Sequence, residues 1–188
     1  MFKKLSAAVF AAFLLTGCRP AVTSLEITSG SRLAAAGFKS VSVPGIKGPE
    51  GASTSLGTFA CPAADCGAQT YLILGVMTPA SRLSADLTIE EALKLGLGDT
   101  GVLEKEMRRK AAGGFSSNGK TYGADVLNVA FSTKRATLDF RFRFTGKDEK
   151  PVFLSTRGRF VANNYRFVMS LSQNAAAASR YARPAWIP

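Results

Sequence analysis

The chain has 188 residues, with 24 lysines and arginines against 13 aspartates and glutamates, a formal net charge of +11, and no histidine. That length fits one domain with a single sizeable core. The absence of histidine excludes Ser–His and Cys–His catalysis, and the cysteines alone are too few for a zinc site. We therefore expect no metal and no cofactor. The basic balance is typical of attraction to anionic headgroups or polymers, or simply of a basic soluble surface.

The first 17 residues have the pattern of a secretory signal peptide. Lys3 and Lys4 form a positive start, and residues 5–15 are apolar except for Ser6. This run is shorter than the roughly 20 residues that cross a bilayer, so we expect it to be cleaved and not to span the membrane. Removing Lys3 and Lys4 leaves 22 basic against 13 acidic residues.

The end of this segment, Leu15-Thr16-Gly17-Cys18, resembles the lipobox of bacterial lipoproteins at every position. The resemblance implies cleavage after Gly17, a diacylglycerol thioether on Cys18 and acylation of the new amino terminus. Several acyl chains anchor a protein stably where one binds marginally. Arg19 stands where enteric lipoproteins of the inner membrane carry aspartate, which favours the outer membrane, facing the periplasm. The alternative is a plain signal peptide with an incidental cysteine.

Two further cysteines, Cys61 and Cys66, are separated by four residues that include a proline. An even pair in an exported chain is typical of a disulfide, and a redox-active pair would more usually be C-x-x-C. Closing so short a loop is expected to stabilise the fold only modestly, by about 2 kcal/mol.

The first half of the mature chain is expected to hold a tether, short strands and two helices. Residues 18–36 are predicted to be the lipidated N-terminus and tether, and residues 37–188 a single globular domain. Alternation predicts a half-buried strand over 38–44, Gly and Pro content a loop over 45–57, and an apolar run a buried strand over 69–77. Helices are predicted to follow near 88–95, after a capping box, and over 100–112.

The second half is the clearest part of the sequence. Strands are predicted over 122–131, 138–145, 152–161 and 165–171, with alternating apolar and polar residues in the second and fourth. An alanine-rich helix is expected over 173–182. Runs of strands separated from runs of helices define an α+β fold, here an antiparallel sheet with a C-terminal four-stranded meander, helices in the middle and a closing helix.

This order of elements resembles the PsbP-like fold, named for an extrinsic protein of photosystem II. The residues that carry the resemblance are the opening at 38–44, the helical middle and the meander at 126–171 with its trailing helix. It would cover about 38–181. Functions in that fold are diverse, so the resemblance implies an interaction role only by analogy.

One string, residues 114–121, matches the phosphate-binding pattern G-x-x-x-x-G-K-[ST]. That loop works where it leaves a strand and enters a helix, and here a helix is predicted before it and a strand after it. We therefore interpret it as a turn. Carboxylate pairs occur at Glu90-Glu91 and at Glu104 with Glu106, all on predicted exposed helix faces, so we do not expect an enzyme.

Arginines recur on the polar positions of the meander strands. Since one buried face fixes which way each strand points, these side chains are predicted to lie together on the other face. Arginine forks suit phosphate and carboxylate groups, whereas the simpler interpretation is a solvated sheet face or one roofed by a helix. The residues predicted to bind anions are Arg141, Arg143, Arg157, Arg159 and Arg166.

The leading hypothesis is a non-enzymatic envelope lipoprotein, attached to a membrane by its lipid, that binds a protein partner or an anionic lipid or polymer. The alternative is a structural or assembly accessory that docks on another membrane protein, and an enzyme comes third. No nucleic acid is expected as a partner. An acid-free basic sheet face would favour the first hypothesis, and a large exposed apolar patch the second.

Overall fold

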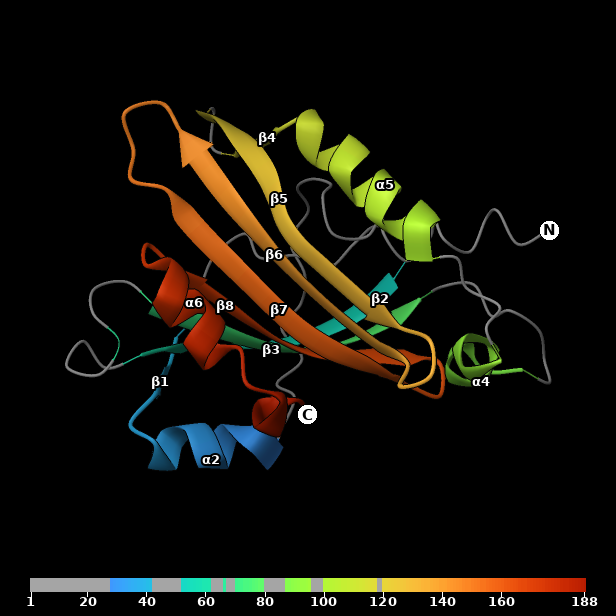
Figure 1. Cartoon of the computed structure of the whole chain (residues 1–188). Helices are drawn as coiled ribbons and strands as arrows, with labels where there is room; N and C mark the ends of the chain where they lie inside the picture. Colours follow the sequence, from blue (N-terminus) through green and yellow to red (C-terminus); the bar gives the residue numbers. More distant parts are fainter. Residues whose placement is uncertain are drawn as a thin grey trace.

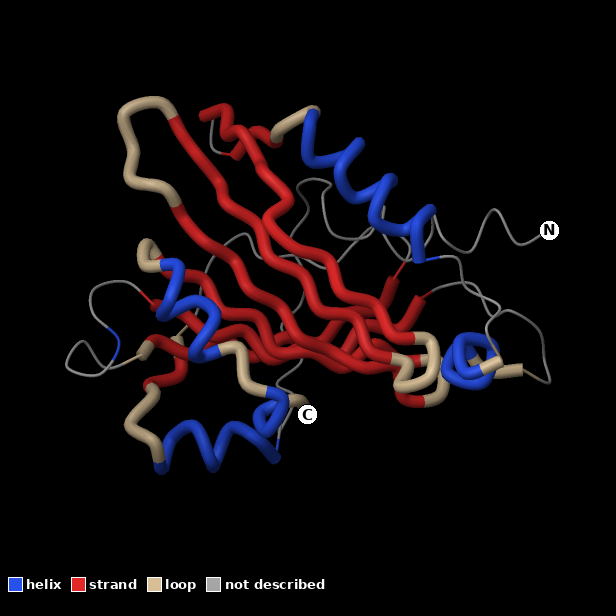
Figure 2. Tube along the Cα trace, viewed as in Figure 1, coloured by secondary structure: helices blue, strands red, loops and turns tan. Residues whose placement is uncertain are grey.

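The structure is a computed structural model that describes residues 28–41, 52–61, 66, 70–79, 87–95, 100–117 and 120–188. Within these ranges the strands form one eight-stranded sheet in the order β1-β2-β3-β8-β7-β6-β5-β4, and all pairs are antiparallel. Figures 1 and 2 show a sheet-dominated molecule with a few helices around it. The elements are α2 (Thr28–Ala35), β1 (Lys39–Ser40), β2 (Ala52–Ala60), β3 (Thr70–Pro79), α4 (Ile89–Lys94), α5 (Thr100–Ala112), β4 (Phe115–Ser117), β5 (Lys120–Ser132), β6 (Thr137–Gly146), β7 (Val152–Val161), β8 (Asn164–Ser172), α6 (Ala175–Tyr181) and the 3-10 turn η2 (Pro184–Trp186).

The predicted meander is present as β5, β6, β7 and β8, which pair in chain order. The middle helices and the closing helix are also present as α4, α5 and α6. The antiparallel sheet with a C-terminal meander is therefore confirmed, and helices contribute less to the fold than the α+β expectation implies. The predicted buried strand is β3, which lies between β2 and β8, with Leu72, Ile73 and Leu74 buried.

The loop predicted over 45–57 is wrong for residues 52–57. These residues belong to β2, which pairs with β3 from Ala52 opposite Pro79 to Ala60 opposite Tyr71. Alanine and glycine, as at Ala52 and Gly57, are weak strand formers, but pairing with the apolar β3 overrides that preference. The strand predicted over 38–44 is reduced, among the described residues, to the two residues of β1.

Part of the predicted tether is a packed helix. Helix α2 lies within residues 18–36, and its Leu33 is fully buried against Phe38 and Tyr181. A single apolar anchor on a polar segment is too weak a pattern to predict such docking. Residues 1–27, and with them the lipobox and Cys18, lie outside the described residues.

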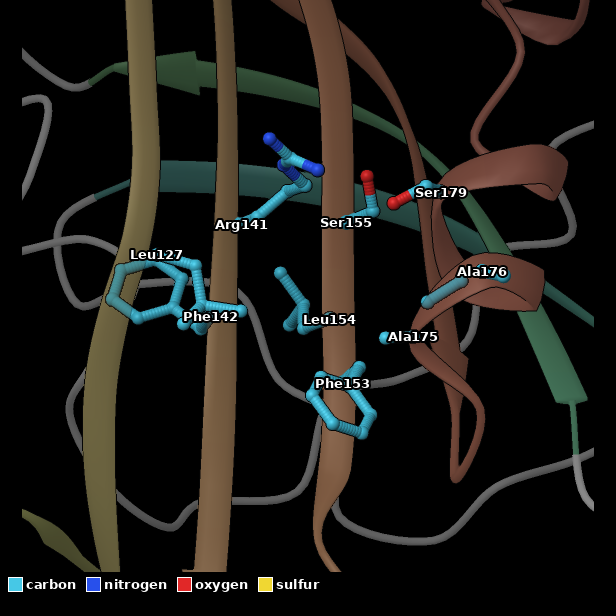
Figure 3. A pocket seen from close by; sticks show the side chains of 10 residues that line it. Leu127, Arg141, Phe142, Phe153, Leu154, Ser155, Ala175, Ala176 and Ser179 are labelled. Carbon is cyan, nitrogen blue, oxygen red and sulfur yellow. The ribbon is translucent and has the colours of Figure 1, made fainter.

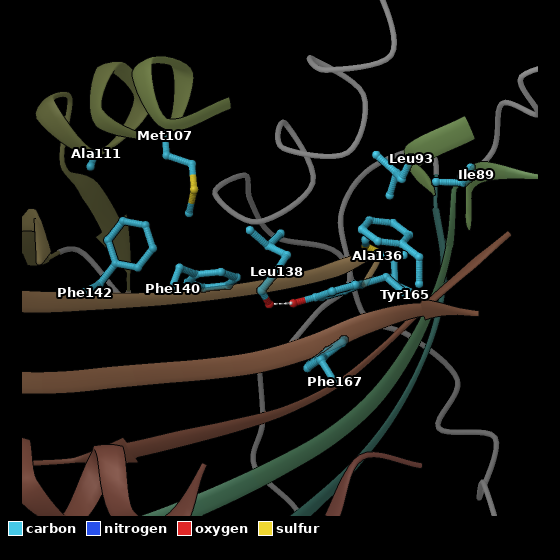
Figure 4. Packing of buried hydrophobic residues seen from close by; sticks show 12 residues of the cluster. Ile89, Leu93, Met107, Ala111, Ala136, Leu138, Phe140, Phe142, Tyr165 and Phe167 are labelled. Atoms are coloured by element: carbon cyan, nitrogen blue, oxygen red, sulfur yellow. Dashed lines mark hydrogen bonds between the residues drawn. The ribbon is translucent and has the colours of Figure 1, made fainter. Parts of the chain in front are cut away.

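The sheet has two faces of different character. Phe140, Phe142, Tyr165 and Phe167 lie on one side, here called the aromatic face, and pack against Met107 of α5 and residues of α4 (Figure 4). The Tyr165 hydroxyl donates a 2.9 Å hydrogen bond to the carbonyl oxygen of Leu138 within this cluster. The opposite side, here called the arginine face, is partly covered by α6, α2 and η2 through a second cluster that includes Leu33, Leu72, Leu74, Val168 and Tyr181.

Candidate anion-binding face of the sheet

Strand β6 fixes the direction of the first two arginines. Leu138, Phe140 and Phe142 are buried on the aromatic face, so Arg141 and Arg143 between them point to the other side. A slip of one residue would bury the guanidinium groups and expose the rings, which makes this orientation strongly preferred.

The ladder register brings the other arginines to the same side. Arg141 is opposite Ser155 and Asp139 is opposite Arg157, while Arg159 lies opposite Thr137 on one side and Arg166 on the other. All five predicted residues therefore share the arginine face across β6, β7 and β8.

Arg166 differs from the other four because it is covered. Its Nη1 donates to the carbonyl oxygen of Pro188 at 3.3 Å, and its Nε is buried without a hydrogen-bond partner among the described residues. The remaining residues stay open to solvent to differing degrees and are called the open arginines below. They are Arg141, Arg143, Arg157 and Arg159.

The face is not free of acids. Asp125 on β5 accepts hydrogen bonds from Nε of Arg143 at 3.0 Å and from Nη2 at 2.8 Å, and both side chains are about half exposed. Asp139 lies beside Arg157; partial burial raises the pKa of its carboxyl, and the Arg157 guanidinium and the Gly158 N–H oppose that rise. Alternation in the sequence already places Asp139 on the side of Arg141, whereas the position of Asp125 opposite Arg143 was not predicted.

Beside the open arginines, a groove of about 240 Å³ lies between β6, β7 and the first turns of α6 (Figure 3). Its walls include Arg141, Ser155 and Ser179, together with Leu127 and Phe153. No pattern in the sequence predicts this groove, because the groove depends on where α6 crosses the sheet.

The cysteine pair lies at one edge of the second cluster. Cys61 and Cys66 have Cα atoms 6.0 Å apart, a distance compatible with the expected disulfide. The Cys61 N–H donates to the carbonyl oxygen of Thr70, and Thr70 Oγ1 donates to the carbonyl oxygen of Cys66. Both cysteines, at the two ends of the short loop, are therefore held to the start of β3.

The carboxylates that could form an acidic pair have structural partners. Glu90 accepts from Lys94 Nζ at 2.6 Å and from the Ala162 N–H at 2.7 Å. Glu91 completes a capping box with Thr88, and Glu106 binds Arg109. The side chain of Glu104 lies outside the description.

The string at 114–121 follows helix α5 and leads into strands, the reverse of the order that a phosphate-binding loop needs. The expected simple turn is wrong for most of its described residues, because Phe115–Ser117 form β4 and Lys120 begins β5. Gly114 has a φ of +61°, as suits a helix end followed by a sharp turn. Among the described residues there is no group of three or more His, Cys, Asp or Glu side chains that could hold a metal ion. In the same residues no helix is long and apolar enough to cross a membrane.

Comparisons with protein-family models, with curated proteins and with solved structures give no match to this chain. The lipobox resemblance and the PsbP-like resemblance both stay predictions.

Proposed function

We propose that the protein is a non-enzymatic envelope lipoprotein, anchored through Cys18 to the outer membrane and facing the periplasm, whose arginine face binds an anionic envelope component. The component would present phosphate or carboxylate groups, as lipid headgroups and acidic polymers do. The observation that carries this proposal is the register that gathers four open arginines against two acids on the same, partly covered face of the sheet.

The geometry of the face suits such a ligand. Arg143 and Arg157 each have an acidic neighbour, and Arg141 and Arg159 lie among them on the same two strands. The exposed Arg143–Asp125 ion pair is weak, at about 0–1 kcal/mol, so a multivalent anion can replace the Asp125 carboxylate. The surface therefore presents several guanidinium groups, separated by the spacing of neighbouring strands.

The expected lipid anchor is compatible with binding of an envelope component at the arginine face. Helix α2 packs in the second cluster with Val168, which is opposite Arg157 in the ladder and therefore shares its face. Cys18 precedes the start of α2 by ten residues, a length that reaches at most about 36 Å when extended. A lipid on Cys18 would thus hold the start of α2, which packs on the arginine face, within about 36 Å of the membrane surface.

The assembly-accessory alternative has less support from the described residues. Large exposed apolar side chains there are spread over four different parts of the fold, namely Tyr71, Leu95, Val102 and Leu127. Such scattered side chains are ordinary for a protein surface.

The test of the arginine face uses residues 18–188 with Cys18→Ser, so that no acyl chain contributes. We expect cosedimentation with vesicles containing anionic lipid, little with neutral vesicles, and a steep loss of binding as salt screens the charges within about 8 Å. The combined Arg141→Gln, Arg143→Gln and Arg157→Gln variant should lose the preference.

The matched control changes the same total charge elsewhere, with Lys134→Gln, Lys147→Gln and Lys150→Gln in exposed turns. It should bind nearly as well as the parent chain. Salt-insensitive binding to both vesicle types, or equal losses in the two triple variants, would contradict a specific arginine face.

The anchor has its own test. Labelled palmitate should enter the wild-type chain in cells and should not enter Cys18→Ser. Normal labelling of that variant would remove the lipoprotein part of the proposal.

A further inference from the structure

The groove beside α6 has a polar end and an apolar end. Figure 3 shows the Arg141 guanidinium and the hydroxyls of Ser155 and Ser179 gathered at one end, with Phe153 and Ala175 toward the other. Ser155 is only 3% exposed, so its side chain is part of the groove wall. Such a division of polarity matches a ligand with one charged head and an apolar tail.

A β-bulge supplies part of the apolar wall. Val126 pairs with Phe142 and Asn128 with Arg141, which leaves Leu127 as an extra residue in β5. Bulges redirect side chains, and Leu127 is 47% exposed while lining the groove. Arg108 of α5 donates to the carbonyl oxygen of Val126 at 3.3 Å and so compensates for the interrupted ladder.

Arg141 is the cation that lies in this groove, and it differs from its neighbour on β6. Arg143 is paired with Asp125, whereas no acid within the described ranges pairs with Arg141. An unpaired guanidinium beside two hydroxyls and an apolar wall is complementary to a single carboxylate on a hydrocarbon chain.

We propose that this groove binds a medium-chain fatty acid, with its carboxylate at Arg141, Ser155 and Ser179 and its chain along Leu127, Phe153 and Ala175. A closed cavity of about 150 Å³ holds one benzene molecule, so about 240 Å³ accommodates about ten non-hydrogen atoms, the size of octanoate. This site goes beyond the proposed function, because it takes one monomeric ligand and needs no membrane surface. It shares only Arg141 with the proposed function.

The experiment is calorimetric titration of residues 18–188 carrying Cys18→Ser with a series of fatty acids from butanoate to dodecanoate. Affinity should rise about two- to fourfold for each added CH₂ and level off near octanoate, where the groove is full. Octanol, which has the same chain without the charge, should bind at least about tenfold more weakly than octanoate.

Two arginine variants make a matched pair, because they lie on the same strand face and change the charge equally. Arg141→Gln should weaken octanoate binding at least about tenfold, whereas Arg143→Gln should leave it within about twofold. Leu127→Ala removes an exposed side chain from the apolar wall and should weaken binding about threefold. Circular dichroism of each variant verifies that the fold is kept.

The outcomes separate this proposal from the previous one. Arg143→Gln with Arg157→Gln should weaken vesicle binding and spare octanoate, and Leu127→Ala should do the reverse. Absence of octanoate binding, equal affinity for octanol, or equal losses in Arg141→Gln and Arg143→Gln would overturn the fatty-acid site while leaving the vesicle result unaffected.

Discussion

The aromatic face and the arginine face are built from alternate residues of the same strands, yet they are closed in different ways. On β6, β7 and β8 the aromatic face carries large rings such as Phe140 and Tyr165, which α4 and α5 cover. On the arginine face, small residues such as Ser155, Ser170 and Ser172 lie buried where the alanine-rich α6 crosses β7 and β8.

The difference shows how one sheet can combine a core and a binding surface. Large rings on the aromatic face pack from strand to strand beneath α4 and α5. Small side chains let α6 approach the sheet closely, but this helix is short and covers only part of the arginine face. Beyond its edge lie the groove and the open arginines. We therefore expect substitutions on the aromatic face to affect stability, and those on the open part of the arginine face to affect binding.

The largest effect is expected where an aromatic ring lies over a glycine. A Cβ at Gly158 would lie 2.6 Å from Cε2 of Tyr165, whose hydroxyl is hydrogen-bonded to Leu138 and whose side chain is fully buried. Since the ring cannot move away, Gly158→Ala should destabilise the fold by about 2–3 kcal/mol in urea unfolding.

Gly123→Ala is the control, because this glycine is exposed in β5 and its nearest neighbour would be Thr145 Oγ1 at 3.2 Å. Its effect should stay within about 0.5 kcal/mol. Equal effects of the two substitutions would contradict the comparison, because they would show that the aromatic face is not tightly packed around Tyr165.

The covered part of the arginine face should depend on the cysteine pair. Replacing Cys61 and Cys66 by alanine opens a short loop and should cost about 2 kcal/mol. Reducing agent should lower the unfolding midpoint of the parent chain and leave the double variant unchanged. Mass spectrometry of the isolated, unreduced protein checks the link, and two thiols open to alkylation would reject it.

The next effect concerns the docking of α4 at the end of the aromatic face. Hydrogen bonds from Lys94 and from the Ala162 N–H lower the pKa of Glu90, and Ile89 donates to Asn163 in the same turn. Glu90→Gln should therefore cost about 1 kcal/mol at neutral pH. Lys94→Gln should cost less, because its ion pair is exposed.

The pH dependence of Glu90 follows from the direction of its shift. A lowered pKa in the folded state means that the carboxylate stabilises the fold above its ordinary value of 4.5, and that this contribution disappears as the pH falls through the lower folded value. The stability difference between the parent chain and Glu90→Gln should accordingly shrink below pH 4.5. A stability difference that stays constant across that pH range would argue against an ionised Glu90 that accepts the hydrogen bond of the Ala162 N–H.

The parts that the sequence predicted are those with a strong local pattern. Alternating phenylalanine and arginine in β6 was sufficient to place Arg141 and Arg143, and the helix over 100–112 was found at its actual bounds. Strand β2 was missed because its residues are small and become a strand only beside β3. The groove was missed because it needs a bulge at Leu127 and the position of α6, neither of which has a signature in one sequence.

The smallest effect on stability is expected at the Arg143–Asp125 pair, and it is the sharpest test of the comparison. The side chains are 47% and 52% exposed, so solvent and salt screen the charges even at the 2.8 Å Nη2–Oδ2 distance. A double-mutant cycle of Arg143→Gln and Asp125→Asn should give a coupling energy of at most about 0.5 kcal/mol. Asp125→Asn alone removes one acid from the arginine face and should strengthen binding to anionic vesicles at low salt.

A coupling energy above about 2 kcal/mol would make the pair part of the structural framework, since only poorly hydrated pairs reach that range. The arginine face would then be held by its ion pairs in the way that the aromatic face is held by its rings, and Arg143 would have to be removed from the open arginines.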